Sequence, residues 1–185
     1  MDEYFELLKC RLLPERYNHS LGVMETAGKL AEHYGMDVKK AETAGLLHDV
    51  TKNCSESEHI EMFKKYNIEY DTELLRAPKI FHQITGAYFV KYELHINDPD
   101  IFGAIRYHAT GHKNMTLFEK IIYIADFIEP ERDFADVDTC RSLAFKDLDK
   151  ACFAYIKFCI EKNVKKGSYI YKDTFEFYNS LTEVV

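Results

Sequence analysis

Apolar residues recur along this chain at three- and four-residue intervals, the spacing of one face of an α-helix. The clearest case lies between Pro14 and Gly35, where proline favours a helix start and glycine a helix end. Its apolar stripe is formed by Leu21, Met24, Ala27, Leu30, Ala31 and Tyr34. Because the chain has only 8 glycines and 4 prolines, the many turns of a β-sandwich are not expected. The pattern predicts an all-α protein.

Capping signals divide the chain into helices. Asp37, Ser55 with Glu58, and Asp98 before Pro99 each have the spacing of a helix start. The expected helices cover residues 2–13, 14–34, 37–48, 55–66, 78–94, 98–108, 116–129, 147–166 and 174–181. No repeat, low-complexity tract or linker interrupts them, so residues 1–185 are predicted to form a single domain.

Composition narrows the function and the compartment. Of the 185 residues, 46% are hydrophobic, enough for a sizeable core, and the formal net charge of −7 argues against non-specific nucleic-acid binding. No apolar run approaches the roughly 20 residues that span a bilayer. The start of the chain lacks the layout of a signal peptide, and the five cysteines contain no CxxC pair. We therefore expect a cytoplasmic protein that binds neither nucleic acid nor membrane.

Four of the eight histidines lie within apolar or small-residue helical segments, which is unusual for such a polar side chain. They are His19, His48, His82 and His108. The other four have polar or loop-like neighbours and are expected at the surface: His33, His59, His95 and His112.

Two aspartates share this apolar context. Asp49 follows His48 at the end of an apolar helix, and Asp126 interrupts the run from Ile121 to Ile128. Burying a carboxylate without a partner costs several kcal/mol. Taken singly, each residue could be a satisfied core histidine or a helix-terminal ion pair. Together on different helices they indicate a divalent metal held by imidazole and carboxylate, and no cysteine is placed for a zinc–thiolate site.

With these positions in hand, the chain resembles the HD-domain phosphohydrolases, whose signature is H…HD…D. It is similar in particular to the YqeK-type symmetrical bis(5′-nucleosyl)-tetraphosphatases over about residues 14–180. The matching segments are residues 44–49 with Lys52, His82 with 86–87, 104–111 and 120–132. Ala109 and Thr51 stand where that family more often has threonine and alanine, which affects substrate detail rather than the reaction class.

The resemblance implies a role for each site residue. The primary metal ligands are His19, His48, Asp49 and Asp126, and the ligands of a second metal or of phosphate are His82 and His108. The catalytic residues are Asp49 and Lys52. The nucleotide contacts are Lys52, His82, His108, Ala109, Arg132, Tyr169, Ile170, Tyr171, Asp173 and Thr174.

The implied fold is a helical bundle with the metal site between its core helices. Its core covers about residues 14–135, and the helices of 136–185 pack on it and complete a nucleotide pocket. The implied reaction is metal-dependent hydrolysis of diadenosine tetraphosphate to two ADP. One or two divalent transition-metal ions are expected, with iron first and manganese, cobalt, nickel or zinc as alternatives.

Other functions stay open at this point. The alternatives are another HD nucleotide phosphohydrolase, such as a deoxynucleotide phosphatase or a phosphodiesterase, a nucleotide-binding module without catalysis, and a diiron oxygenase. The oligomeric state is also open, with a homodimer among the alternatives.

Overall fold

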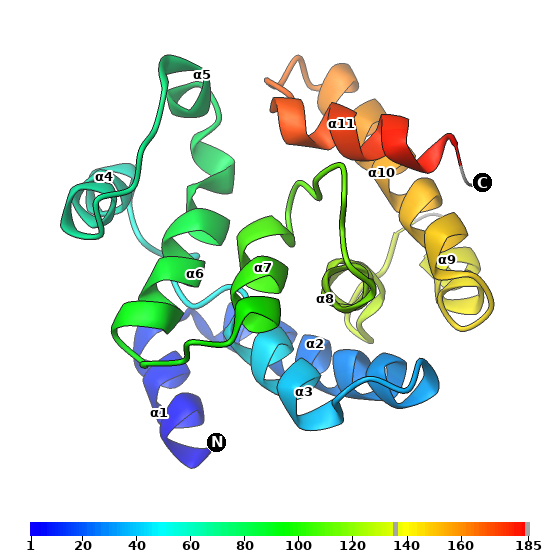
Figure 1. Cartoon of the computed structure of the whole chain (residues 1–185), viewed down its shortest axis with the longest axis horizontal. Coiled ribbons are helices and arrows are strands. Elements are labelled where there is room, and N and C mark those ends of the chain that lie inside the picture. The colour runs from blue at the N-terminus through cyan, green and yellow to red at the C-terminus, as the bar shows by residue number, and fades with distance from the viewer. Residues whose placement is uncertain (135–136, 184–185) are drawn as a thin grey trace.

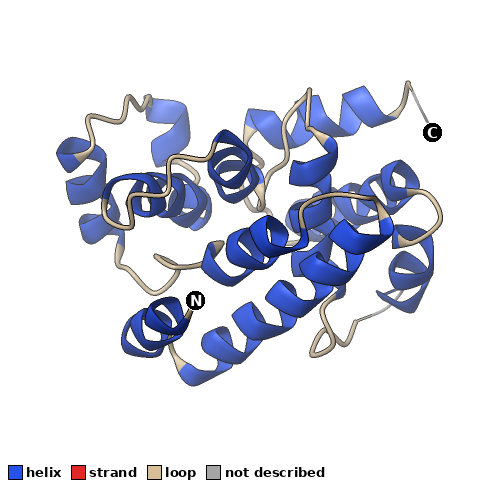
Figure 2. Cartoon of the chain, turned by 60° about the horizontal axis from the view of Figure 1, so that its bottom comes forward, coloured by secondary structure: helices blue, strands red, loops and turns tan. Residues whose placement is uncertain are grey.

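The structure is a computed structural model that describes residues 1–134 and 137–183, and these residues form helices and loops with no strand (Figures 1 and 2). The all-α prediction is confirmed. The helices are α1 Asp2–Arg11, α2 Pro14–His33, α3 Val38–Leu47, α4 Glu56–Lys65, α5 Thr72–Leu75, η1 Pro78–Ile80, α6 Phe81–Tyr92, α7 Pro99–Tyr107, α8 Leu117–Ile128, α9 Val137–Ala144, α10 Leu148–Lys165 and α11 Lys172–Leu181.

The helix starts follow the capping signals of the sequence. Ser55 and Glu58 form a complete capping box at α4, and the Asp98 side chain accepts hydrogen bonds from the backbone at α7. The helix expected over 78–94 begins instead as a 3-10 turn, η1, before α6. Two short helices, α5 and α9, were not expected, because neither is long enough to show a clear apolar period.

Helix α8 is the centre of the core. Most of its residues are apolar, and Ile121, Ile122, Tyr123 and Ile124 are fully buried. In Figure 1, α8 is seen nearly end-on, with α7 to its left, α2 and α3 below it, and α9 and α10 to its right. Helices α2, α3 and α7 all pack against α8. The polar residues near the start of α2 and at the C-terminal ends of α3 and α7 are therefore brought close to one another beside α8.

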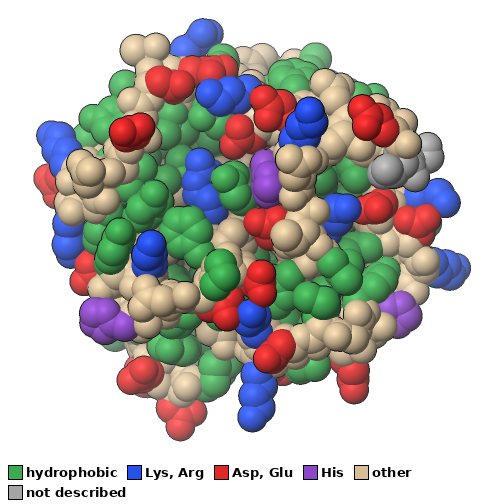
Figure 3. Space-filling view, in the orientation of Figure 1, with side chains coloured by type: hydrophobic (Ala, Val, Ile, Leu, Met, Phe, Trp, Pro, Cys, Tyr) green, Lys and Arg blue, Asp and Glu red, His purple; other side chains and the backbone are tan. Residues whose placement is uncertain are grey.

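The outer surface carries acidic and basic side chains interspersed, as Figure 3 shows for one face. No helix in the described ranges combines the length and apolarity that crossing a membrane requires.

Candidate metal centre and its cavity

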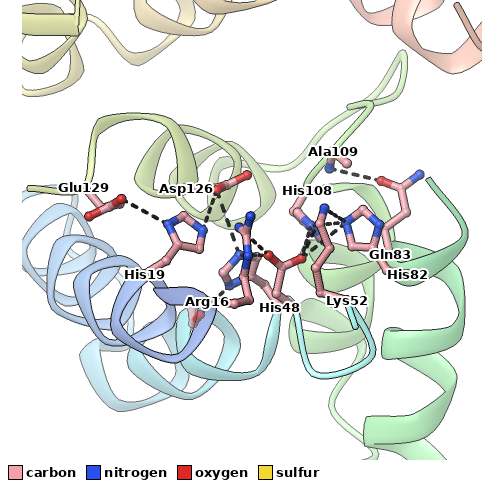
Figure 4. A network of polar contacts seen from close by, with 12 residues as sticks. Arg16, His19, His48, Lys52, His82, Gln83, His108, Ala109, Asp126 and Glu129 are labelled. Carbon is pink, nitrogen blue, oxygen red and sulfur yellow. Dashed lines mark hydrogen bonds and ion pairs between the residues drawn. The ribbon is translucent and has the colours of Figure 1, made fainter. Parts of the chain in front are cut away.

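The structure brings the four expected primary ligands together from three helices (Figure 4). His19 comes from α2, Asp126 from α8, and His48 with Asp49 from the C-terminal end of α3; all four are buried. His19 Nε2 lies 2.9 Å from Asp126 Oδ1. His48 Nε2 lies 3.4 Å from Asp49 Oδ2 and 3.9 Å from Asp126 Oδ1.

His82 and His108 extend this cluster on the side of Asp49. Their Nε2 atoms are 3.1 Å apart and lie 3.3 and 3.4 Å from Asp49 Oδ1. Two sets of three have ligand atoms within 4.8 Å of one another: His19, His48 and Asp126, and His48, Asp49 and His108. The six side chains thus form one row, called here the ligand row, and His48 belongs to both sets.

His48 and His108 are oriented by the same device. Each is the C-terminal cap of its helix, and its Nδ1 lies 2.7 or 2.8 Å from the carbonyl oxygen three residues earlier, of Gly45 or Ile105. A carbonyl can only accept, so Nδ1 carries the proton and donates. The Nε2 lone pair of each ring is therefore directed toward the ligand row, as a metal ligand requires.

His19 is oriented by a carboxylate that the sequence did not suggest to us, that of Glu129. Its Nδ1 lies 3.0 Å from Glu129 Oε1, and the other carboxylate oxygen accepts the backbone N–H of Glu131 at 2.7 Å. Gly22 leaves room for this carboxylate, since a Cβ there would stand 2.7 Å from Glu129 Oε2. Glu129 is almost completely buried after an apolar helix, the same anomaly that singled out Asp126.

The cluster fits a divalent transition metal. His48 Nε2 and Asp49 Oδ1 are buried without a hydrogen-bond partner, an arrangement that costs about 1–3 kcal/mol per group. A cation held between them satisfies both atoms, and a donor set of imidazole and carboxylate suits iron, manganese, cobalt, nickel or zinc.

The protonation states suit the same role. Burial raises the pKa of the Asp49 carboxyl, but the positive charge of Lys52, together with the adjacent imidazoles of His48 and His108, outweighs that effect, so the pKa lies well below its usual range. Asp126 is shifted in the same direction, because His19, His48 and Arg132 outweigh the effect of burial on its pKa.

The imidazoles at the far end of the row are shifted the other way. Burial lowers the pKa of His82 well below its ordinary value, and the charge of Lys52 lowers it further. Burial also lowers the pKa of His108. The carboxylates are thus ionised and these imidazoles neutral at neutral pH.

Three cations face the ligand row. Arg16 Nη1 donates to Asp49 Oδ2 at 2.9 Å, and Arg132 Nη2 donates to Asp126 Oδ1 at 2.7 Å. Lys52 Nζ lies 3.0 Å from His82 Nε2. Lys52 and Arg132 are expected nucleotide contacts, whereas Arg16 was missed, because an arginine in the first turn of a helix looks like an ordinary surface charge.

The ligand row opens into a cavity of about 530 Å³, called here the first cavity. All but one of the expected nucleotide contacts line it: Lys52, His82, His108, Ala109, Arg132, Tyr169, Ile170, Tyr171 and Thr174. Asp173 does not line it, and burial raises the pKa of that carboxyl. The lining also includes Arg76, at the end of α5, and Lys79, in η1, which the sequence did not single out because they look like ordinary surface charges.

One expected surface histidine is in fact buried, and that prediction was wrong. His59 lies on the face of α4 that packs against α6, with Nδ1 2.8 Å from Thr85 Oγ1 and its ring in edge contact with Phe81. Burial lowers the pKa of its imidazole to about 4. The polar neighbours of His59 in sequence occupy the outer face of α4, while His59 itself faces α6.

This geometry defines a class of protein, and comparison with known families agrees with it. The family model of the HD domain matches residues 16–131, which contain every residue of the ligand row. The chain belongs to the HD domain family.

Proteins similar over nearly the whole chain narrow the comparison. The symmetrical bis(5′-nucleosyl)-tetraphosphatase of Bacillus subtilis is 41% identical, with 97% of this chain and 96% of that protein covered. The protein of the same name from Staphylococcus aureus is 38% identical, over 94% and 90% of the two chains. A crystal structure from Clostridium acetobutylicum, described as a predicted HD superfamily hydrolase involved in NAD metabolism, has a TM-score of 0.96 at 40% identity, covering 98% and 96%.

Proposed function

We propose that this protein hydrolyses diadenosine tetraphosphate symmetrically to two molecules of ADP. The observation that carries the proposal is the buried row of imidazoles and carboxylates at the base of a cavity that basic side chains also line. The proposal is supported by the symmetrical tetraphosphatases to which the chain is similar over 94–97% of its length.

The metal belongs to the same proposal. His19, His48, Asp49 and Asp126 would hold a divalent transition metal, with iron the first candidate, and His82 and His108 would hold a second ion or bind substrate phosphate. When bound, such an ion supplies Lewis acidity and makes hydroxide available near neutral pH. This chain contributes ionised carboxylates and buried Nε2 lone pairs directed toward the ligand row to hold the ion.

The cations have a role that follows from the charge of the substrate. A tetraphosphate bridge is strongly anionic, and Arg16, Lys52 and Arg132 surround the position where it would cross the ligand row. Arginine forks bind phosphate oxygens with two parallel hydrogen bonds, which orients the phosphate as well as attracting it. Lys52 and Asp49 are the proposed catalytic residues. Asp49 belongs to the ligand row, Lys52 lies beside it, and both line the first cavity.

The nucleoside would lie against the wall formed by Tyr169, Ile170 and Tyr171, where an aromatic ring can stack on adenine. In this proposal the chain acts as one unit, 1–185, because the segment after residue 136 supplies that wall. It also places the enzyme in the cytoplasm, and none of the described cysteines is joined in a disulfide.

Product analysis tests the function. Protein loaded with Fe²⁺, Mn²⁺ or Co²⁺ is incubated with diadenosine tetraphosphate, and the nucleotides are separated by anion exchange. ADP as the single nucleotide product supports the proposal, whereas AMP with ATP, or no turnover, contradicts it. Faster turnover of deoxynucleoside monophosphates or cyclic dinucleotides would assign the site to another phosphohydrolase reaction.

A further inference from the structure

A second cavity, of about 580 Å³, lies at the end of the ligand row that His19 forms. Its lining consists of polar and charged side chains around one exposed leucine: Leu13, Glu15, Arg16, His19, Lys52, Asn53, Glu129, Glu131 and Arg132. None of these residues except Lys52 and Arg132 was expected to contact nucleotide.

The two cavities meet at the ligand row. Arg16, Lys52 and Arg132 line both of them. Of the ligand row, Asp49, His82, His108 and Asp126 line the first cavity, whereas His19 lines the second. Figure 4 shows the same order, with His82 at one end of the row, His19 and Glu129 at the other, and the Arg16 side chain between them.

This arrangement matches the shape of a symmetrical substrate. A dinucleoside tetraphosphate has two identical halves, and cleavage at its centre requires the middle of the phosphate chain to lie over the ligand row. The halves then extend to opposite sides of that row. We propose that the second cavity binds the second nucleoside of the substrate, a proposal that rests on the function proposed above.

The chemistry of the second cavity suits a nucleoside rather than a phosphate. The Leu13 side chain is 64% exposed and offers an apolar surface to a base. Asn53 Oδ1 accepts the backbone N–H of Leu13 at 2.9 Å, which leaves its amide N–H groups available as donors. The carboxylates of Glu15 and Glu131 can accept from ribose hydroxyls or an exocyclic amine, and they repel phosphate.

A third cavity, of about 280 Å³, is the rival location. It shares Lys79, Arg132, Tyr155, Cys159 and Asn163 with the first cavity, and its other lining residues are Phe127, Phe134, Phe158, Lys162 and Lys166. Its aromatic rings already pack against one another, as Phe127 does on Tyr155 and Phe134 on Phe158. None of its lining residues belongs to the ligand row, so it lies along the first cavity rather than across the row from it. We therefore assign the second nucleoside to the cavity of Leu13.

The test compares one ligand that fills both cavities with one that fills a single cavity. The Michaelis constant of diadenosine tetraphosphate is measured beside the inhibition constant of adenosine 5′-tetraphosphate, which lacks the second nucleoside. Leu13→Ser is expected to raise the first constant about fivefold, the size expected for one lost apolar contact, and to leave the second unchanged. Tyr169→Ala, in the first cavity, raises both.

Leu117→Ser is the matched control, since Leu117 is also an exposed leucine at a helix start but lines neither cavity. It leaves both constants unchanged. If Leu13→Ser changes neither constant, or both equally, the assignment is overturned. It is also overturned if Lys162→Ala selectively raises the Michaelis constant of diadenosine tetraphosphate. Absence of ADP formation by the wild type would instead contradict the proposed function itself.

Discussion

The ligand row and the wall of the first cavity are built in different ways. Every residue of the ligand row is buried on a helix or at its end, and its orientation is set by fixed partners such as the Gly45 carbonyl and Glu129. The wall formed by Tyr169–Tyr171 belongs to the loop between α10 and α11, and two of its three side chains are half-buried. The metal ligands are thus held by fixed partners within the helical core, whereas the substrate surface depends on contacts between a loop and the short helix α5.

Two contacts hold the wall in position. Tyr169 donates from its hydroxyl to Glu73 Oε1 at 2.8 Å, and the Arg76 guanidinium lies 4.5 Å from the centre of its ring. Residues about 95 positions apart therefore hold the wall in place. We expect substitutions in the ligand row to abolish metal binding and turnover, and substitutions in the wall to change mainly substrate affinity.

Removal of a central ligand has the largest expected effect. His48→Ala takes away the nitrogen that both three-residue sets share. We expect the metal content to fall to background and the rate to fall at least about 1,000-fold, equivalent to about 4 kcal/mol of transition-state stabilisation. Elemental analysis and product formation check this. His33→Ala, at an exposed histidine, is the control, and a His48→Ala protein that keeps its metal would contradict the site.

Weakening the support of a ligand has a smaller effect. Glu129→Gln keeps the shape of the side chain but removes the charge that holds the Nδ1–H of His19. We expect metal affinity to fall about 10- to 100-fold, measured by titration of chelator-treated protein. Glu131→Gln, at an exposed neighbour, should not change it. Equal affinities in all three proteins would show that Glu129 has no positioning role.

A change in the wall of the first cavity should affect substrate affinity without affecting metal binding. Tyr169→Ala removes the ring that faces the first cavity, and we expect the Michaelis constant for diadenosine tetraphosphate to rise about tenfold, the loss of one base–aromatic stack. Metal content should not change. Tyr169→Phe keeps the ring and loses only the bond to Glu73, so its effect should be smaller. Loss of metal from Tyr169→Ala would mean that wall and ligand row are not independent.

The last prediction concerns stability and its pH dependence, with no expected change in catalysis. The pKa of His59 is about 4 in the folded protein, against 6.5 for the free group, so the unfolded state binds more protons between these values. The free energy of unfolding should therefore fall as pH falls from 6.5 to 4, by roughly 1–3 kcal/mol from this residue. His59→Gln should flatten that part of the curve in urea denaturation, whereas His33→Gln should not.

The sequence predicted the fold class and the ligand row because both leave local signals. Capping residues define the helix starts, and a charged residue such as Asp126 in an apolar helix is expensive unless something binds it. The sequence did not reveal Arg16, Arg76 or Lys79, because surface cations are common and only the folded chain shows which of them face a cavity. His59 was misplaced for a related reason, since sequence neighbours on a helix point in different directions.

In the proposed function, the ligand row holds a cation on which the reaction depends. The most direct measurement is to add Fe²⁺ or Mn²⁺ stepwise to chelator-treated protein, recording bound metal and ADP formation from diadenosine tetraphosphate on the same samples. We expect a negligible rate without metal and a rate that rises in step with occupancy of the site. Full turnover in the metal-free protein, or occupancy with no ADP produced, would contradict it.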